Sequence, residues 1–382
     1  MRVALVHYWL AVMGGGEKVL EAICRLYPEA DIYTHVLRPE NLPPELRRHA
    51  IRTTFINALP GSARHYQKYL PLMPLALEQL DLTGYDLVIS SESGPAKGVI
   101  TRPDALHLCY CHSPMRYLWD NWPVYQVNAG RFTRLCSRFL LPRLRQWDVL
   151  SAMRVDRIVA NSRHVARRIR KYWRREAHVV HPPVDTQAYA PRAQAGGEHY
   201  LCFGRLTHYK RVDLAIEACN RLGRQLLIIG DGEERRRLEA LAGPTVRFLG
   251  RLDDAEVRAL LARSRALLFP GEEDFGIIPV EAMSAGVPVI AYGRGGARET
   301  VQEGLTGLLF DEQRADCLQA AILRFEALEE SFSPSVLHAH AEEFSEARFA
   351  QAFRSEVERG FAELESRPAH DADGDTDGRR SA

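Results

Sequence analysis

The sequence is poor in cysteine, lacks a long apolar run and carries almost no net charge. Its seven cysteines are scattered and no pair has zinc spacing, which argues against a zinc ribbon or a disulfide scaffold and fits a reducing cytoplasm. No apolar run reaches the roughly 18 residues of a membrane span, and the first residues enter a strand pattern without the apolar core of a signal peptide. The formal net charge of +1 argues against a general nucleic-acid binder. We therefore expect a cytoplasmic protein that at most lies on a membrane surface.

A complete dinucleotide-binding fingerprint is also missing. Gly14-Gly15-Gly16-Glu17 follows the first predicted strand and resembles a phosphate-cradling turn, but it is not Gly-x-Gly-x-x-Gly. No acidic residue ends a clear second strand, where the ribose of NAD would be held. The glycines allow a ligand to approach the backbone closely, or they form only a tight turn. An NAD enzyme is not expected.

The chain is long enough, at 382 residues, for two domains of ordinary size. Short apolar strand patterns alternate with helical patterns, which indicates an α/β fold with doubly wound parallel sheets. The first series of predicted strands is 2–7, 30–33, 51–54, 85–90, 106–110, 157–161 and 177–181. A linker rich in Ala, Gly, Pro and Gln follows at 190–198. The second series is 200–204, 225–230, 246–249, 266–270, 287–291 and 307–310.

Two such sheets in tandem predict a cleft bounded by the carboxyl ends of their strands, where open α/β sheets bind ligands. We expect an N-terminal domain at 1–188 and a C-terminal domain at 189–344, with a helix at about 345–364 packing back on the first domain. The tail at 366–382 is polar and free of aromatic residues, and we expect it to be disordered.

The stretch 271–281 lies between an apolar strand pattern and a second one that follows a short helix. It places two carboxylates, Glu273 and Glu281, at the end of a strand and in the following helix. Its backbone can bind an anion, because glycine allows close approach and free N–H groups at a helix N-terminus suit phosphate. The backbone groups concerned are those of Gly276, Ile277 and Ile278. Backbone amides that suit phosphate lie between two carboxylates that suit hydroxyl groups. This combination suggests one ligand with phosphates and several hydroxyls, such as a nucleotide sugar.

His112 directly follows a predicted strand, so it should lie at the carboxyl edge of the first sheet. A lone histidine is often only a satisfied surface or core residue, but its place at the edge of the cleft favours a functional role. Cys109 and Cys111 beside it lie in an apolar strand pattern. We expect them to be buried core cysteines and not a redox pair.

Arg205 and Lys210 follow the first strand of the second sheet, and Lys210 is expected to open the next helix. Two cations beside a helix N-terminus suit a diphosphate, with ordinary solvated charge as the alternative. Arg251 follows the strand at 246–249 and could border a nucleobase, although capping of the next helix by Asp253 explains much of that loop.

The segment 131–175 holds fourteen Arg or Lys against two Asp, with aromatic and leucine side chains interleaved. No nucleic-acid recognition motif accompanies the charge. An anionic membrane surface fits better, since each basic residue near such a surface contributes roughly 1 kcal/mol. A solvated, salt-bridged helix face is the alternative. The stretch Leu59–Leu80, with basic residues and tyrosines before a Leu-Pro run, is a further candidate for a membrane contact.

Together these positions resemble a known family. Glu273 and Glu281 are eight positions apart with Phe275-Gly276 between them, and are similar to the E-x7-E signature of the family 4 retaining glycosyltransferases. The other parts of the resemblance, which spans about residues 1–360, are the Gly14–Gly16 loop, His112, Arg205 and Lys210. It implies the GT-B fold, two Rossmann-like domains facing across a cleft. The sequences of Val3–Leu10 and Cys109–Tyr117 resemble those of the bacterial mannosyltransferases that build O-antigen and exopolysaccharide repeats.

The resemblance implies a role for each residue. Glu273 would hold hydroxyls of the transferred sugar and Glu281 the hydroxyls of the ribose. Arg205 and Lys210 would neutralise the departing diphosphate, and His112 would contact the sugar, with its carbonyl steadying an oxocarbenium-like transition state. In such retaining enzymes the departing phosphate accepts the acceptor's proton, so no protein nucleophile is needed. The further donor-binding positions are Gly15, Gly16, Arg251, Phe275, Gly276, Ile277 and Ile278.

The branch resemblance implies mannose from GDP-mannose as the donor sugar and a lipid-diphosphate-linked saccharide as the acceptor, at the inner face of the cytoplasmic membrane. A UDP-sugar donor handled by the same residues stays open, as does an inactive binding or scaffold protein of an envelope-assembly complex. No cofactor and no metal are expected, because Asp-x-Asp triplets, the metal motif of the other glycosyltransferase fold, occur only in the tail. No role is assigned to Trp119, Trp122 and Tyr125.

Overall fold

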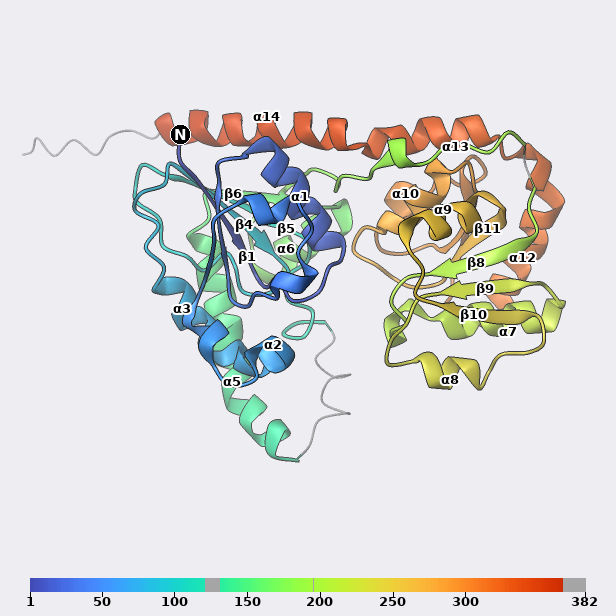
Figure 1. Ribbon diagram of the computed structural model, residues 1–382, viewed down its shortest axis with the longest axis horizontal. Helices are drawn as coiled ribbons and strands as arrows, with labels where there is room; N and C mark the ends of the chain where they lie inside the picture. Colours follow the sequence, from blue (N-terminus) through green and yellow to red (C-terminus); the bar gives the residue numbers. More distant parts are fainter. Residues whose placement is uncertain (121–130, 195, 367–382) are drawn as a thin grey trace, which may run out of the picture.

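The computed structural model describes residues 1–120, 131–194 and 196–366, and in the helix at 131–153 the side chains from residue 137 onward. The described residues form two α/β units side by side, each built on one parallel sheet (Figure 1). We call them the first unit, which holds the first sheet, and the second unit. The tail was predicted to be disordered at 366–382, and its residues 367–382 lie outside the described residues, as do Trp122 and Tyr125.

The first sheet has the strand order β3-β2-β1-β4-β5-β6-β7, and each neighbouring pair is parallel. Its central strands are buried along their length, as apolar runs covered on both faces should be. In this register His7 stands beside Ser91, and Glu92 beside Cys111, so polar residues that end three strands meet at one edge. The strands are β1 (Val3–His7), β2 (Asp31–Thr34), β3 (Ile51–Thr53), β4 (Leu87–Glu92), β5 (Leu106–Cys111), β6 (Arg157–Ala160) and β7 (His178–Val179).

The second sheet has the order β10-β9-β8-β11-β12-β13 and is also parallel throughout. Its strands are β8 (His199–Phe203), β9 (Leu226–Ile229), β10 (Val246–Gly250), β11 (Ser264–Phe269), β12 (Val289–Tyr292) and β13 (Gly307–Phe310). Counted from its own first strand, each sheet contains the order 3-2-1-4-5-6 of doubly wound dinucleotide-binding folds. The predicted fold class, two doubly wound parallel-sheet domains facing each other, is confirmed.

Helices cover the faces of both sheets (Figure 1). Those that precede the second sheet are α1 (Gly15–Leu26), α2 (Ser62–His65), α3 (Met73–Glu78), α5 (Arg131–Met153) and α6 (Arg163–Tyr172). Those that follow are α7 (Val212–Leu222), α8 (Arg235–Glu239), α9 (Asp254–Ala262), α10 (Ile277–Ser284), α11 (Ala297–Thr300), α12 (Ala315–Leu328), α13 (Pro334–Ala341) and α14 (Glu346–Glu365). The short 3-10 turns are η1 (Pro39–Asn41), η2 (Leu46–Arg48), η3 (Phe55–Ala58), η4 (Tyr66–Leu72), η5 (Thr186–Ala188), η6 (His208–Lys210), η7 (Glu329–Ser331) and η8 (Glu342–Phe344).

The last helix returns to the first unit. α14 runs along that unit (Figure 1), and its residues Phe349, Phe353 and Val357 join the apolar core of the first sheet. Arg157 on β6 is buried and pairs with Glu356 of α14 at 2.7 Å. These contacts support the division that we propose, with boundaries near residues 188 and 344.

Candidate active site

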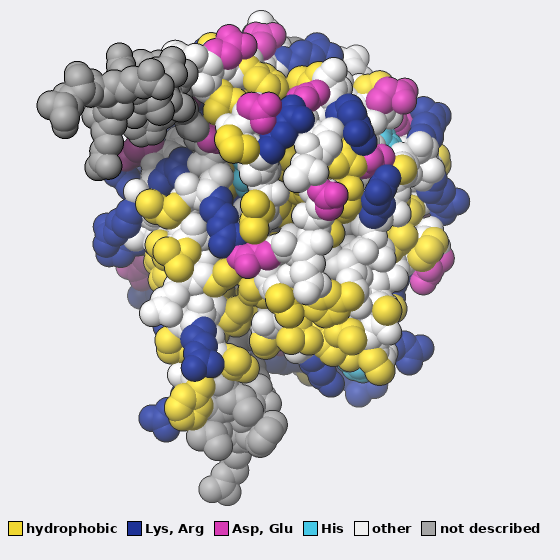
Figure 2. Space-filling view, turned by 90° about the vertical axis from the view of Figure 1, so that its left-hand side faces the viewer, with side chains coloured by type: hydrophobic (Ala, Val, Ile, Leu, Met, Phe, Trp, Pro, Cys, Tyr) yellow, Lys and Arg dark blue, Asp and Glu magenta, His cyan; other side chains and the backbone are white. Residues whose placement is uncertain are grey.

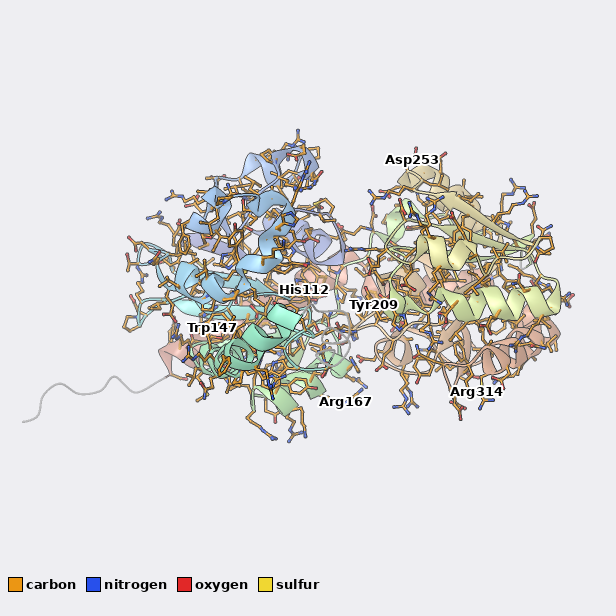
Figure 3. All side chains as sticks on the ribbon, turned by 90° about the horizontal axis from the view of Figure 1, so that it is seen from below. His112, Trp147, Arg167, Tyr209, Asp253 and Arg314 are labelled. Atoms are coloured by element: carbon orange, nitrogen blue, oxygen red, sulfur yellow. The ribbon has the colours of Figure 1, made fainter. Side chains whose placement is uncertain are left out.

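A cavity lies between the carboxyl ends of the two sheets. It has a volume of about 740 Å³ and is lined by residues from both units. Figure 3 shows His112 of the first unit and Tyr209 of the second near each other where the units meet. The sequence predicted a cleft at this place.

Most of the predicted site residues line this cavity: Gly15, Gly16, His112, Lys210, Glu273, Phe275, Gly276, Ile277 and Ile278. Three others do not. Arg205 is 69% exposed and pairs with Glu233 at 3.6 Å, Arg251 is exposed, and Glu281 contacts Lys18. The roles predicted for these three residues in donor binding stay predictions.

The half of the cavity in the second unit has groups that can bind an anion. Lys210 Nζ lies 2.9 Å from Glu273 Oε1. Burial acts to lower the pKa of Lys210, but the Glu273 carboxylate outweighs it and raises that pKa, so the ammonium is charged. α10 starts beside it at Gly276, which has φ +89° and gives no side-chain cap to the helix. Its first amides and the ammonium can therefore both meet a phosphate.

Lys210 does not open a helix as predicted. It ends the turn η6, and α7 starts at Val212. The cause is Arg211, whose φ of +50° belongs to the left-handed region that a right-handed helix cannot include. Because the chain changes direction at Arg211, Lys210 points back into the cavity beside Glu273, and only 14% of its side chain is exposed.

The half in the first unit centres on His112, whose ring ends a chain of hydrogen bonds. His112 Nε2 lies 2.8 Å from Ser91 Oγ, which lies 2.9 Å from His7 Nδ1. His7 Nε2 lies 3.4 Å from Glu17 Oε1. Since a carboxylate only accepts, His7 donates from Nε2 and accepts from Ser91, and Ser91 in turn accepts from His112 Nε2–H. This assignment leaves His112 Nδ1 as an acceptor for a sugar hydroxyl.

His112 is a neutral group at physiological pH. Burial and the neighbouring His7 lower its pKa to about 3, so it can orient a hydroxyl but cannot supply a positive charge. Its backbone carbonyl accepts a hydrogen bond of 2.9 Å from Asn161 Nδ2. A carbonyl oxygen has a second lone pair, which stays available for the role implied by the family resemblance.

The start of α1 comes close to the start of α10. A Cβ atom on Gly15 would lie 3.1 Å from Ile277 Cδ1, and one on Gly16 would lie 2.3 Å from the Tyr8 hydroxyl. Position 16 therefore requires glycine for close approach and not for backbone strain, whereas a Cβ atom at Gly15 would be accommodated if the end of the Ile277 side chain moved slightly. Like α10, α1 has no side-chain cap at its first residue, so two helix N-termini border the same cavity.

The sequence did not reveal the contacts that join the two units at this cavity. Asp274, directly after Glu273, pairs with Arg116 and Arg168 of the first unit. Opposite charges at these positions were visible, but residues more than a hundred positions apart leave no periodic signal of their pairing. Trp119, which received no role, donates from Nε1 to the buried Asp148 at 2.8 Å.

Much of the basic segment 131–175 is engaged within the protein. Arg157 and Arg168 are buried, and Arg175 donates to the carbonyls of Ala152 and Val155. Fewer charges are therefore free to meet a membrane than the sequence predicted. Among the side chains described from residue 137 onward, the exposed basic ones of this segment are Arg138, Arg143, Arg154, Arg163, Arg167, Arg170, Lys171 and Arg174. Cys109 and Cys111 are fully buried, as predicted.

Among residues 1–120, 131–194 and 196–366, no group of three or more His, Cys, Asp or Glu side chains could hold a metal ion. No helix in the same part of the chain is long and apolar enough to span a bilayer.

Two family profiles cover most of the chain. Residues 13–188 match Glycosyltransferase Family 4, and residues 188–339 match Glycosyl transferases group 1. The family is generally independent of metal and uses nucleotide sugars.

Two curated relatives are mannosyltransferases. The chain is 27% identical over 370 residues to the alpha-1,3/1,6-mannosyltransferase alg2 of Schizosaccharomyces pombe, covering 81% of this chain and 70% of that protein. It is 40% identical over 121 residues to a GDP-mannose-dependent alpha-mannosyltransferase of Mycolicibacterium smegmatis, covering 31% of this chain and 32% of that one.

A solved structure shares the fold. The Anabaena protein HepE, crystallised in complex with UDP, superposes with a TM-score of 0.69 at 18% identity, covering 94% of this chain and 100% of that one. This likeness shows the fold, and the profiles matched on both units show the family. The chain belongs to the family 4 retaining glycosyltransferases of GT-B fold.

Proposed function

We propose that this glycosyltransferase moves mannose from GDP-mannose to a lipid-linked saccharide in the synthesis of a cell-surface polysaccharide. The observation that carries the proposal is the convergence of Lys210, the amide end of α10, Glu273 and His112 on one cavity. Phosphate oxygens meet the first two groups, and sugar hydroxyls meet the carboxylate and the imidazole acceptor.

In the proposed reaction the bond between the sugar C1 and the diphosphate oxygen breaks, and a bond from an acceptor hydroxyl to C1 forms on the same face. The hydroxyl proton passes to the departing phosphate oxygen. Lys210 and the amides at 276–278 stabilise the negative charge that grows on the diphosphate. Preorganised groups of this kind in a closed cleft contribute about 3–4 kcal/mol each to lowering a barrier. Arg205, more exposed, would add its charge from the rim of the cavity.

The donor sugar and base are the finer part of the proposal. Two relatives named as mannosyltransferases, one of them dependent on GDP-mannose, support mannose and guanine. The UDP complex of HepE supports the alternative, a UDP-sugar held by the same residues. Thermal denaturation with GDP-mannose, UDP-glucose and UDP-N-acetylglucosamine decides between them, because a bound donor raises the midpoint by mass action. A shift with a UDP-sugar and none with GDP-mannose would contradict the proposed donor.

We propose that the reaction needs no metal, since Lys210 and the helix end supply the positive field at the diphosphate. Activity in EDTA should equal activity in untreated buffer. Loss of activity in EDTA that manganese or magnesium restores would contradict this part of the proposal.

We further propose that the first unit binds the anionic inner face of the cytoplasmic membrane, where the lipid-linked acceptor would be located. On the face seen in Figure 2, hydrophobic side chains gather near lysines and arginines. Phe139 and Leu140 on α5 are 69% and 37% exposed, and Leu72 and Leu75 on the neighbouring η4 and α3 are 41% and 53% exposed. Binding to anionic liposomes should weaken as salt is added. Absence of binding at low salt would remove the membrane surface from the proposal.

An inactive scaffold protein is the alternative from another class. Replacement of Glu273 or Lys210 by Ala separates the two readings, because an enzyme loses turnover while a scaffold keeps its binding partners. Full turnover in either variant would contradict the roles proposed for these residues.

A further inference from the structure

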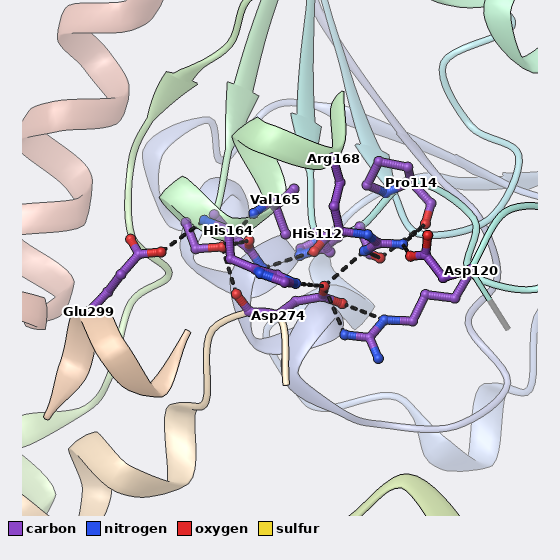
Figure 4. Close-up of polar contacts among 12 residues, drawn as sticks. His112, Pro114, Asp120, His164, Val165, Arg168, Asp274 and Glu299 are labelled. Atoms are coloured by element: carbon purple, nitrogen blue, oxygen red, sulfur yellow. Dashed lines mark hydrogen bonds and ion pairs between the residues drawn. The ribbon is translucent and has the colours of Figure 1, made fainter. Parts of the chain in front are cut away.

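The loop that carries Glu273 is held from the opposite unit. Asp274, the next residue, faces two arginines of the first unit (Figure 4). Arg116 reaches its carboxylate through Nε at 3.0 Å and Nη2 at 2.8 Å, and Arg168 through Nη1 at 2.9 Å. The side chains of Asp274, Arg116 and Arg168 are only 18%, 25% and 10% exposed, so salt screens this cluster weakly.

The carboxylate of Asp274 is charged in this setting. Burial alone would raise its pKa, but Arg116 and Arg168 outweigh burial and hold that pKa below its usual range. Removing one partner from such a shielded cluster leaves the other charges without compensation, which is costly. The contact is therefore strong enough to fix the position of the loop.

Arg168 connects Asp274 to the residues that follow His112. Its Nη1 donates to Ser113 Oγ at 2.6 Å and its Nη2 donates to the Pro114 carbonyl at 3.1 Å. Asp120 pairs with the same guanidinium. One side chain thus holds the loop of Glu273 and the loop of His112 together.

A second route joins the same two loops through the backbone. Ser162 Oγ donates its one proton to the Asp274 carbonyl at 2.6 Å, and Asn161 precedes Ser162 in the chain. Asn161 Nδ2 donates to the His112 carbonyl at 2.9 Å. Asp274 is therefore tied to His112 through its carboxylate and through its carbonyl, by different residues.

We propose that Asp274 is a positioning residue that fixes Glu273 relative to His112 across the cavity between the two units. The inference rests on the roles proposed above for Glu273 and His112. Neither Asp274 oxygen has to touch the substrate for this role. Misplacing a reacting group by about 1 Å can cost a factor of about 100 in rate, so losing this contact should act on the chemical step more than on donor affinity.

The chain offers a matched control. Glu299 on α11 also bridges the units: it accepts from the backbone N–H groups of Arg163 and His164 at 2.8 Å each and lies 3.3 Å from His181 Nε2. It does not contact the loops of Glu273 or His112 in any interaction found among the described residues. Replacing Glu299 therefore weakens a contact between the units but leaves the contacts that hold Glu273 relative to His112 in place.

The test compares Asp274→Asn and Arg116→Gln with Glu299→Gln. We expect the first two to lower the rate of sugar release from GDP-mannose by about 10-fold or more. The dissociation constant of GDP should stay within about threefold, since Lys210 and the α10 amides belong to the second unit. In small-angle scattering with GDP, both variants should show a larger radius of gyration than the wild type. Glu299→Gln should keep its rate within about threefold of the wild type.

Two results would overturn the inference: rates for Asp274→Asn and Arg116→Gln near the wild-type value, or a loss in Glu299→Gln as large as theirs. If Asp274→Asn does not fold, Arg116→Gln tests the same contact from the more exposed side. Scattering needs no turnover. A wild-type protein that does not use GDP-mannose therefore contradicts the proposed donor and leaves the positioning role to be judged by the radius of gyration.

Discussion

Lys18 Nζ lies 3.0 Å from Glu281 Oε1, and this pair joins the first turn of α1 to α10 across the boundary between the units. The lysine side chain is 56% exposed and that of Glu281 only 10%. Burial acts to lower the pKa of Lys18, but Glu281 outweighs it and raises that pKa. Glu281 therefore holds a cation at the position where the family resemblance implies a ribose, and the two roles can be separated.

Replacing Glu281 by Ala should raise the dissociation constant of GDP by about 10- to 100-fold, because a hydrogen bond to a charged group contributes about 1.5–3 kcal/mol. Replacing Lys18 by Ala should change it by less than about fivefold, because an exposed ion pair contributes at most about 1 kcal/mol. Isothermal titration calorimetry measures both. Equal effects of the two variants would show that Glu281 acts through the ion pair and not as a ribose ligand.

Gly16 is confined by the Tyr8 hydroxyl, which a Cβ atom at this position would meet at 2.3 Å. Gly16→Ala should therefore lower the free energy of unfolding by about 1–3 kcal/mol through overpacking and reduce turnover. Tyr8→Phe removes the obstructing oxygen and leaves Cζ, at 3.4 Å, as the nearest atom. The double variant should recover much of the loss in urea unfolding.

Gly14→Ala is the control for this pair, because its Cβ would meet only Glu17 Oε2, at 3.3 Å, at the end of a flexible side chain. Its unfolding midpoint should match that of the wild type. A Gly16→Ala loss that Tyr8→Phe does not reduce would contradict the steric explanation.

The fold could be predicted because its signals are local. The apolar runs that became β1, β5, β8 and β13 are short and bounded by turn residues, and the strand ends carry glycine or polar residues. Several helix starts were also readable, such as Asp253, which caps α9 together with Glu256. The prediction failed at Lys210 because the next residue, Arg211, has a left-handed conformation. Nothing about an arginine side chain predicts that conformation.

The residues of each half of the site could be predicted, but the contacts between the two halves could not. Gly276 and Lys210 each follow a strand, so topology alone placed them at the edge of the second sheet. The pairing of Asp274 with Arg116 and Arg168 and of Lys18 with Glu281 depends on how two independent sheets approach each other. No local pattern in the sequence records that approach.

A buried ionic cluster under the first sheet edge should dominate the stability of that unit. Lys97, Glu92 and Asp148 are fully buried. Lys97 contacts both carboxylates, and Asp148 Oδ2 accepts from the indole N–H groups of Trp119 and Trp173 at 2.8 Å each. Lys97→Met would leave two carboxylates without their cation, so the free energy of unfolding should fall by about 3–5 kcal/mol.

Adding Asp148→Asn to Lys97→Met should restore part of this loss, because asparagine is neutral and still offers an oxygen to both indoles. Chemical denaturation of the three proteins gives the comparison. Arg314→Met, at an exposed side chain (Figure 3), is the control and should not move the midpoint. A double variant less stable than Lys97→Met would contradict the view that uncompensated charge causes the loss.

Three buried histidines should make the protein sensitive to mild acid. Burial lowers the pKa of His35 and His107 to about 4 and that of His112 to about 3, whereas in the unfolded chain a histidine has a pKa of about 6.5. Between these values the unfolded state binds more protons than the folded state. The free energy of unfolding must therefore fall as the pH falls from about 6.5 towards 4, by up to about 1.4 kcal/mol per pH unit for each histidine.

Urea unfolding at pH 7, 6 and 5 measures this slope. His107→Gln removes one of the three groups and should reduce the slope between pH 6 and 5 by about one proton, or roughly 1.4 kcal/mol per pH unit, whatever the variant does to stability at pH 7. His65→Gln, at an exposed side chain, should leave the slope as it is. If His107→Gln kept the wild-type slope, the buried imidazole would be taking up a proton in the folded protein, and its hydrogen bond of 3.0 Å with Ser90 Oγ would have to be assigned to the charged ring.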